Sequence, residues 1–192
     1  MYVMTFYSFK GGVGRTLALV NVAVELAQIG KSVLLVDFDL EAPGLGAFKP
    51  LLPKTGTPGI VEFVTDYLKT ETAPVADQYI SLCSSLQEMP GKIWVMPCGV
   101  RDGTYSARLS CLDWQNLYAQ RDGYLLFEDL RAQWQSHLNP DYVLIDSRTG
   151  HTDVAGICTR QLPDAVVLCF LPNEENLSGL ECIVQDIRLE KQ

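Results

Sequence analysis

The sequence contains no hydrophobic run long enough to cross a membrane, since a helical span needs roughly 18 to 20 apolar residues. Its N-terminus lacks a basic region followed by an apolar stretch and a small-residue cleavage site, which together mark a secretory signal. Internal repeats, low-complexity tracts and Gly/Ser-rich linkers are also absent. We therefore expect a cytoplasmic protein without a membrane partner, folded as a single domain over residues 1–192.

Paired cysteines and histidines are scarce as well. The six cysteines never form a C-x-x-C pair, and Cys169 and Cys182 are separated without an intervening His, so no zinc or iron–sulfur site can be read. Nothing indicates an oxidising compartment, and we expect buried, reduced thiols. The two histidines, His137 and His151, are expected to face solvent.

Basic residues are outnumbered. Fifteen Lys and Arg against 23 Asp and Glu give a net charge of −8, which opposes nonspecific attraction to nucleic acid. We expect no strong nucleic-acid binding. The three tryptophans, Trp94, Trp114 and Trp134, are interpreted as packing residues and not as a platform for stacking bases.

What the sequence does contain is an alternation of strands and helices. A β-rich run at Tyr2–Tyr7 precedes a predicted helix. This helix is apolar except for Asn21, Glu25 and Gln28, whose spacing places them on one narrow solvent-exposed stripe. Gly30 is predicted to end this helix. Residues 32–36 are apolar on both faces, which is typical of a central parallel strand.

The alternation continues along the chain. Further strands are predicted at Ile80–Cys83, Ile93–Pro97, Tyr142–Ile145 and Ala165–Leu171, and further helices at Ile60–Leu68, Leu112–Tyr118, Tyr124–Leu138 and Glu174–Leu189. This order favours an α/β fold with a mostly parallel twisted sheet and helices on both faces, a three-layer α/β/α arrangement. Because a pair begun at Ala165 would normally feed another strand, we expect a shortened chain or the N-terminal part of a longer protein.

A glycine-rich loop lies between the first strand and its helix, with the sequence F-K-G-G-V-G-R-T from Phe9 to Thr16. Glycines let such a loop turn tightly and point backbone N–H groups inward, and the following helix N-terminus reinforces an anion site. The ordinary phosphate-loop pattern G-x-x-x-x-G-K-[ST] is not met, because Phe9 stands at its first glycine and Arg15 at its lysine.

The loop resembles the deviant Walker A motif, K-G-G-x-G-K-[ST], of the ParA/MinD-like P-loop ATPases. By that resemblance Lys10 matches the signature lysine, which typically reaches across a dimer to the partner's nucleotide, and Thr16 matches the Mg²⁺ ligand. Arg15 departs from the family lysine. The residues that the resemblance places at ATP are Lys10, Gly11, Gly12, Val13, Gly14, Arg15, Thr16 and Leu17.

Two later segments resemble the same family. The run V-L-L-V-D-F-D-L ends in Asp37 and Asp39, like the carboxylates of a first switch region, and Y-V-L-I-D ends in Asp146, like a Walker B strand. The resemblance implies that Asp39 orients the attacking water, and that Asp37 and Asp146 serve the Mg²⁺ shell through water. Gly150 would offer its N–H to the γ-phosphate. For each aspartate the alternative role is a helix or turn cap.

The glycine loop, Asp37–Leu45, Leu112–Trp114 and Asp146–Gly150 together resemble a subgroup whose nucleotide module commonly opens larger proteins. The resemblance to this subgroup implies a fused or separate signalling or helical-repeat domain as partner. Arg148 is interpreted either as a charge sensor at the γ-phosphate or as a surface ion pair. The polar stretch Arg101–Leu112 could border the nucleotide or a partner, and Pro172–Asn173 could contact the base.

Together with the arginine at position 15, the resemblance implies an ATP-binding molecular switch with slow Mg²⁺-dependent hydrolysis, a dimer with ATP and a monomer otherwise, in which Asp39, Lys10 and Arg15 act in catalysis. An arginine keeps the positive charge of the family lysine but is planar and longer. One lost contact of about 3 kcal/mol slows turnover roughly a hundredfold. The alternatives are a nucleotide-binding interaction module with little or no hydrolysis, and a DNA-partition ATPase.

Overall fold

The computed structural model describes residues 1–51, 53, 56–83, 86, 88–150 and 152–190. Six strands form one sheet in the order β3-β4-β2-β5-β1-β6. Neighbouring strands are parallel except β3, which is antiparallel to β4. The strands are β1 Tyr2–Tyr7, β2 Ser32–Asp37, β3 Ser81–Leu82, β4 Lys92–Met96, β5 Tyr142–Asp146 and β6 Ala165–Leu168. The mostly parallel sheet predicted from the sequence is confirmed.

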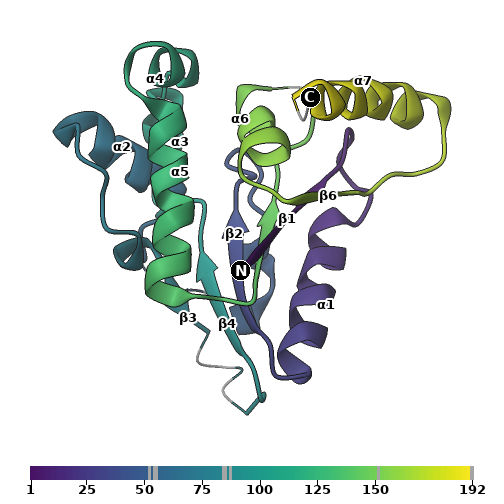
Figure 1. Cartoon of the computed structure of the whole chain (residues 1–192), viewed down its shortest axis with the longest axis horizontal. Helices are drawn as coiled ribbons and strands as arrows, with labels where there is room; N and C mark the ends of the chain where they lie inside the picture. Colours follow the sequence, from purple (N-terminus) through teal and green to yellow (C-terminus); the bar gives the residue numbers. More distant parts are fainter. Residues whose placement is uncertain (52, 54–55, 84–85, 87, 151, 191–192) are drawn as a thin grey trace.

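Helices cover both faces of this sheet, as Figure 1 shows, with α1 on one side and α2 and α5 on the other. The helices are α1 Arg15–Gln28, α2 Ile60–Thr70, α3 Tyr105–Ser110, α4 Trp114–Gln120, α5 Gly123–Gln133, α6 Asp153–Gly156 and α7 Glu174–Glu190. Two π-helical turns, Trp134–Leu138 and Ile157–Gln161, continue α5 and α6. The predicted helices are present. Two short helices were not predicted, α3 inside the polar stretch Arg101–Leu112 and α6.

The central strands are buried as predicted. Side chains of β2 from Val33 to Val36 and of β5 from Val143 to Ile145 have no exposed surface, since helices pack on both faces. In α1 the polar residues Asn21, Glu25 and Gln28 are exposed while Leu19, Ala23 and Ala27 are buried. The glycine after the helix has a φ of 84°, the left-handed conformation typical of a helix end.

The prediction of a buried strand over Ala165–Leu171 is wrong in two respects. The strand ends at Leu168, and its residues are only partly buried, with Val167 exposed. Phe170 and Leu171 are 42% and 54% exposed. The reason is the position of β6 at one edge of the described sheet, where β1 is its strand partner. At the other edge, β3 is reduced to two residues.

The cysteine prediction is partly wrong. Cys83, Cys98 and Cys158 are buried, whereas Cys111 and Cys182 are exposed because they lie at the end of α3 and on the outer face of α7. Burial raises the pKa of the Cys83 and Cys98 thiols to about 11. All six thiols are free.

The tryptophan prediction is confirmed, since Trp134 is fully buried and Trp94 and Trp114 pack against the same core. His137 is exposed, with its Nδ1 atom 3.3 Å from Asp77 Oδ1, and His151 lies outside the described residues. Among the helices of the described chain, none is long and apolar enough to span a membrane.

Candidate functional site

The carboxyl ends of three neighbouring strands meet at one edge of the sheet. Asp37 at the end of β2 is in register with Asp146 at the end of β5, and Asp146 is also in register with Phe6 of β1. The chain leaves β1 through the glycine loop and enters α1 at once. Ligands of open parallel sheets bind outside the carboxyl ends of the strands, so this edge is the expected place for a site.

The loop itself is open. Gly11, Gly12 and Gly14 are exposed, and a side chain added at any of them would meet nothing within 4 Å. Gly12 and Gly14 have φ values of 76° and 82°, which favour glycine. No backbone N–H from Lys10 to Gly14 donates a hydrogen bond to another described residue. These free donors lie at the N-terminus of the 14-residue α1, an arrangement suited to an anion.

Arg15, the first residue of α1, does not point into solvent. Its Nε donates to Asp146 Oδ1 over 2.6 Å, and its Nη2 donates to Asp39 Oδ2 over 2.7 Å. A longer contact of 3.3 Å joins Nη1 to the Oγ of Ser8. All four side chains are buried. The guanidinium therefore lies between Asp39 and Asp146, for which the family resemblance implies roles in water activation and in the metal shell.

The charges of this cluster are coupled. Burial lowers the pKa of Arg15, but its contacts with Asp146 and Asp39 outweigh this effect, so that its pKa is raised and the cation is retained. Burial raises the pKa of Asp146, while Arg15 and the Thr16 hydroxyl oppose that rise. Asp37 has a pKa well above its ordinary value, first because it is buried and then because Asp146 is near.

Thr16 is held in the same cluster. Its Oγ1 donates to Asp146 Oδ2 over 2.7 Å. Gly44 covers it from the chain that follows Asp39, where a side chain would come within 2.8 Å of Oγ1. Asp37 accepts from the backbone N–H of Leu45 over 3.3 Å, which ties that covering segment to β2. Gly44 was missed as a site residue, although it stands in the run that follows the two aspartates.

The donor set suits a magnesium ion held largely by phosphate and water. A hydroxyl and carboxylates are the oxygen ligands that Mg²⁺ prefers, and such ions usually take only one or two protein ligands directly. In the described part of the chain, no group of three or more His, Cys, Asp or Glu side chains is placed to hold a metal by itself. Thr16 and Asp146 would therefore hold Mg²⁺ together with a bound phosphate chain.

The Lys10 side chain contacts α7. It is 47% exposed, and its Nζ is 2.7 Å from Glu175 Oε1 of α7 and 5.7 Å from the centre of the Phe9 ring. Val13 is partly buried and Leu17 is exposed on α1. Glu175 gave no sequence signal, because it stands far from Lys10 along the chain.

Two of the residues interpreted from the sequence beyond the loop, Arg148 and Asn173, make contacts of their own in the structure. Arg148 pairs with Glu41 over 2.6 Å, so it forms a surface ion pair in this state. The Asn173 side chain accepts from the backbone N–H of Asn176 over 2.9 Å and thus caps α7. Gly150 has a φ of 77°. Arg101 and the residues after it border a cavity of about 460 Å³ together with Glu41 and Arg148, beside the strand ends.

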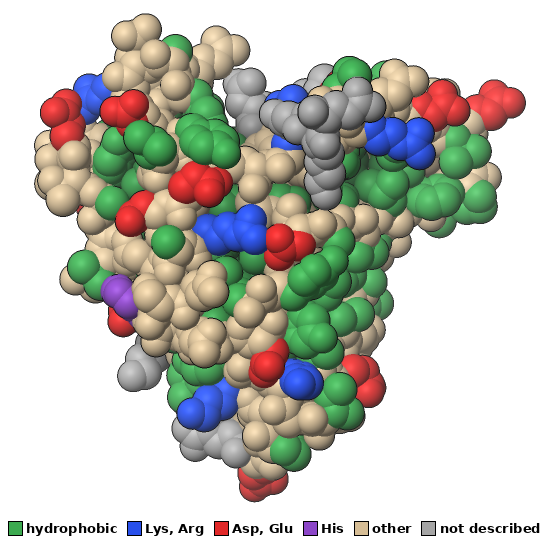
Figure 2. Space-filling model, in the orientation of Figure 1, with side chains coloured by type: hydrophobic (Ala, Val, Ile, Leu, Met, Phe, Trp, Pro, Cys, Tyr) green, Lys and Arg blue, Asp and Glu red, His purple; other side chains and the backbone are tan. Residues whose placement is uncertain are grey.

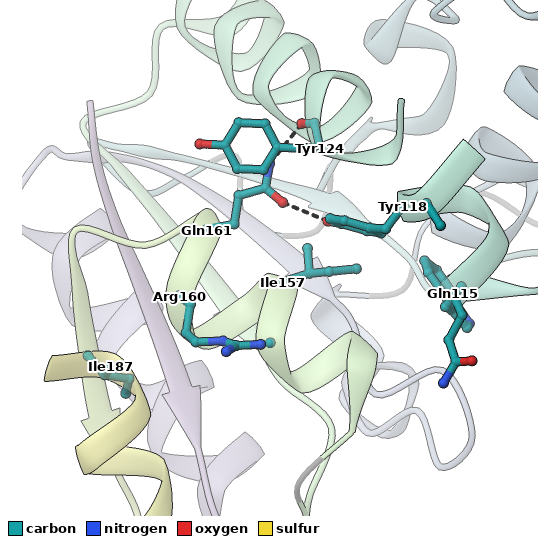
Figure 3. A pocket seen from close by; sticks show the side chains of 10 residues that line it. Gln115, Tyr118, Tyr124, Ile157, Arg160, Gln161 and Ile187 are labelled. Carbon is teal, nitrogen blue, oxygen red and sulfur yellow. Dashed lines mark hydrogen bonds between the residues drawn. The ribbon is translucent and has the colours of Figure 1, made fainter. Parts of the chain in front are cut away.

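A second cavity, of about 670 Å³, lies away from the glycine loop between α4, α5 and the π-helical turn after α6. Figure 3 shows Tyr118, Tyr124 and Ile157 around it, with Ile187 of α7 on the side opposite Gln115. Tyr118 donates its hydroxyl to Gln161 Oε1 over 2.6 Å. On the face drawn in Figure 2, Lys and Arg side chains are interspersed with Asp and Glu, without a continuous basic area among the coloured residues.

Sequence comparison matches the beginning of the chain. A family model described as an AAA domain matches residues 1–45. Over 51 residues, 24% of this chain, the sequence is 49% identical to the virulence plasmid ParA family protein pGP5-D of Chlamydia trachomatis. That match spans 19% of the length of the chlamydial protein. The family model covers the first strand, the glycine loop and the first helix.

Solved structures match almost the whole chain. A putative plasmid partition protein from Borrelia burgdorferi B31 bound to AMPPNP has a TM-score of 0.71 at 16% identity, covering 100% of this chain and 70% of that one. Apo McdA from Cyanothece gives 0.71 at 18% identity, with 100% and 66% covered. MinD complexed with Mg-ADP from Pyrococcus horikoshii gives 0.67 at 19%, with 96% and 65% covered. At these identities the likeness establishes a common fold.

Proposed function

We propose that this chain is a ParA/MinD-like P-loop ATPase domain that works as an ATP-dependent molecular switch, a proposal supported by its fold and by the sequence of its glycine loop. It binds ATP with Mg²⁺, hydrolyses it slowly and dimerises in the ATP state. The observation that carries the proposal is the row of free loop amides beside the buried cluster of Arg15, Asp39 and Asp146. The carboxyl ends of the strands thus bring together N–H donors that suit a phosphate chain and carboxylates that suit a metal ion and a water molecule.

The residues would act in sequence. The amides from Lys10 to Gly14 bind the phosphates, and the dipole of α1 reinforces the attraction. When bound, Mg²⁺ neutralises charge on the phosphate oxygens. Asp146 holds water on the metal side together with Thr16. Asp39 orients the attacking water once Arg15 has moved from it to a phosphate oxygen.

Arg15 is the expected cause of slow turnover. In the structure its guanidinium makes hydrogen bonds of 2.6 and 2.7 Å to two buried carboxylates. It must leave both before it can neutralise charge on a phosphate, and its planar fork cannot replace the point charge of a lysine without a shift of the loop. Each missing contact of about 3 kcal/mol slows the reaction roughly a hundredfold.

Single-turnover hydrolysis tests the role of Arg15. We expect Arg15→Lys to hydrolyse bound ATP faster than the native chain, because a lysine can bridge the phosphates without distorting the loop. Arg148→Lys is the matched control, since that arginine forms only a surface ion pair. An unchanged or lower rate in Arg15→Lys contradicts the account.

Light scattering after size-exclusion chromatography tests the switch. We expect a dimer with Mg-ATP and a monomer with ADP or without nucleotide, because Lys10 would contribute charge to the partner's phosphates only when a γ-phosphate is present. One and the same mass in all three conditions contradicts dimerisation. Calorimetry with Mg-ATP tests binding separately, and a site that cannot be filled contradicts the whole proposal.

The contact between Arg15 and Asp39 also favours a second candidate, a nucleotide-binding interaction module with little or no hydrolysis. If Arg15 stays on Asp39 after ATP binds, no carboxylate is free to orient water. Phosphate release followed for hours separates the two candidates. A DNA-partition ATPase is a third candidate, suggested by the names of the relatives and opposed by the net charge of −8. It requires salt-dependent DNA binding.

A further inference from the structure

Helix α7 contains a glycine in its interior, Gly179, where glycine is less favourable than alanine by about fivefold in the helix–coil equilibrium constant. The reason lies on the glycine loop. A Cβ at Gly179 would come within 2.2 Å of Cδ1, 2.3 Å of Cγ and 2.4 Å of Cε1 of the Phe9 ring. Because these atoms include the ring carbon nearest the backbone, rotation of the ring alone cannot relieve the collision. The ring is seated directly against the helix backbone.

The residue next to Phe9 contacts the same face of α7. Glu175 stands one helical turn before Gly179, so the two share a face. Its carboxylate accepts the Lys10 ammonium at 2.7 Å. Phe9 also packs on the small apolar cluster formed by Tyr7, Ala155, Leu180 and Ile183. Two successive loop residues are thus held by two successive turns of one helix.

α7 also contacts the segment that follows the Walker B strand. Ala155 of α6 belongs to the cluster that includes Leu180 and Ile183, and α7 packs on the π-helical turn Ile157–Gln161. The helix therefore lies against both chain segments that face the strand edge, the glycine loop and the continuation of β5. Figure 1 shows α7 beside α6, above the loop between β1 and α1.

We infer that α7 positions the glycine loop: Gly179 seats Phe9, and Glu175 holds Lys10 until a partner's nucleotide replaces it. The inference rests on the proposed function, since Lys10 needs releasing only if it contacts a partner's phosphates. Phe9 stands where the ordinary phosphate loop has a glycine, so its ring needs space beside the loop. The loop amides can take their phosphate-binding positions only while the ring lies against Gly179. The ion pair between Glu175 and Lys10 then sets the protein concentration at which the ATP form dimerises.

A double-mutant cycle tests the contact between Gly179 and Phe9. Gly179→Ala is expected to weaken ADP binding at least tenfold and to lower the melting temperature of the nucleotide-free chain. In a Phe9→Leu background, the same change is expected to leave ADP affinity unchanged and to raise the melting temperature, because alanine favours the helix. Ser178→Ala on the exposed side of α7 is the control. Equal effects of Gly179→Ala in both backgrounds overturn the inference.

The readouts separate this inference from the proposed function. If the native chain does not bind ADP, the proposed function fails, whereas the reversal of the melting-temperature change is still measurable. A purely structural role for Gly179 lowers the melting temperature but leaves ADP affinity unchanged in measurements well below melting, and this outcome also overturns the inference.

Glu175→Gln tests the ion pair between Glu175 and Lys10. Since the pair is exposed, we expect the concentration at which the ATP form dimerises to fall by about two- to fivefold, with ADP affinity unchanged. Glu181→Gln, an exposed acid on the same helix, is the matched control. A dimerisation midpoint equal to that of the control, or higher, contradicts the role of Glu175.

Discussion

Replacing Arg15 by alanine should destabilise the nucleotide-free protein more than almost any surface change. The substitution leaves two carboxylates without their cation, of which Asp146 is 0% exposed and Asp39 only 12% exposed at the side chain. Breaking a buried ion pair by removing one partner costs about 3 to 5 kcal/mol. Against a total of about 5 to 15 kcal/mol for a typical domain, this is a large fraction.

Urea unfolding followed by circular dichroism measures this loss. Arg15→Lys keeps the charge and can reach one carboxylate, so we expect a smaller loss of about 1 to 3 kcal/mol. Arg148→Ala, at a surface ion pair, is expected to change the unfolding free energy by less than about 1 kcal/mol. A loss below about 1 kcal/mol for Arg15→Ala refutes the view that the guanidinium neutralises the buried acids.

The pH dependence of this loss has a definite sign. Burial already raises the pKa of Asp146, and Arg15 opposes that rise. Without Arg15 the folded-state pKa moves further above the unfolded value, so the variant loses stability as pH rises through the range between the two values. The deficit of Arg15→Ala should therefore be largest at neutral pH and shrink as the pH falls toward 4, where a proton neutralises the carboxylate.

At pH 8 a thiol reagent should modify Cys111 and Cys182 quickly, whereas the three buried thiols (Cys83, Cys98 and Cys158) should react only after unfolding, since burial raises their pKa. Mass spectrometry of labelled peptides checks this, and fast labelling of a buried thiol contradicts the packing. Hydrogen bonds from Thr104 and Arg108 lower the pKa of Asp102 to about 2, so its stabilising effect is present above about pH 4 and is lost as pH falls toward 2. Asp102→Asn should accordingly lower the melting temperature at pH 7 but not at pH 2. Leu130→Ala in the core, where the side chain is 0% exposed, should cost about 2 to 5 kcal/mol in chemical unfolding. Its neighbour on α5, Leu125, is 63% exposed, and the same change there should cost less than about 0.5 kcal/mol.

Much of the fold could be predicted because its signals are local. The buried strands are continuous apolar runs, the glycine loop has a short motif, and α1 shows a clean stripe of polar residues. The six-residue α3 was missed because its sequence is polar and has no apolar periodicity. The end of β6 was misplaced because apolar residues at a sheet edge look the same in sequence as those at its centre.

The candidate site was predictable in its members but not in their contacts. The glycines, Asp39 and Asp146 stand in short motifs at strand ends, and the parallel sheet brings strand ends together. The contacts of Arg15 with Asp146 and of Phe9 with Gly179 join chain segments more than a hundred residues apart, and Asp39 is 24 residues from Arg15. Only the folded chain brings such pairs into contact, and no local pattern records them.

The alignment of Asp37 with Asp146 across β2 and β5 also bears on how the sheet assembles. Side chains alternate between the two faces of a strand, so sliding either strand by one position would exchange its inner and outer sets. Such a slip would press a carboxylate into an apolar layer and separate it from the guanidinium that compensates it. The acids at the ends of the two strands thus penalise misaligned pairing of the central strands, and chains that collapse in the wrong alignment are driven to reopen.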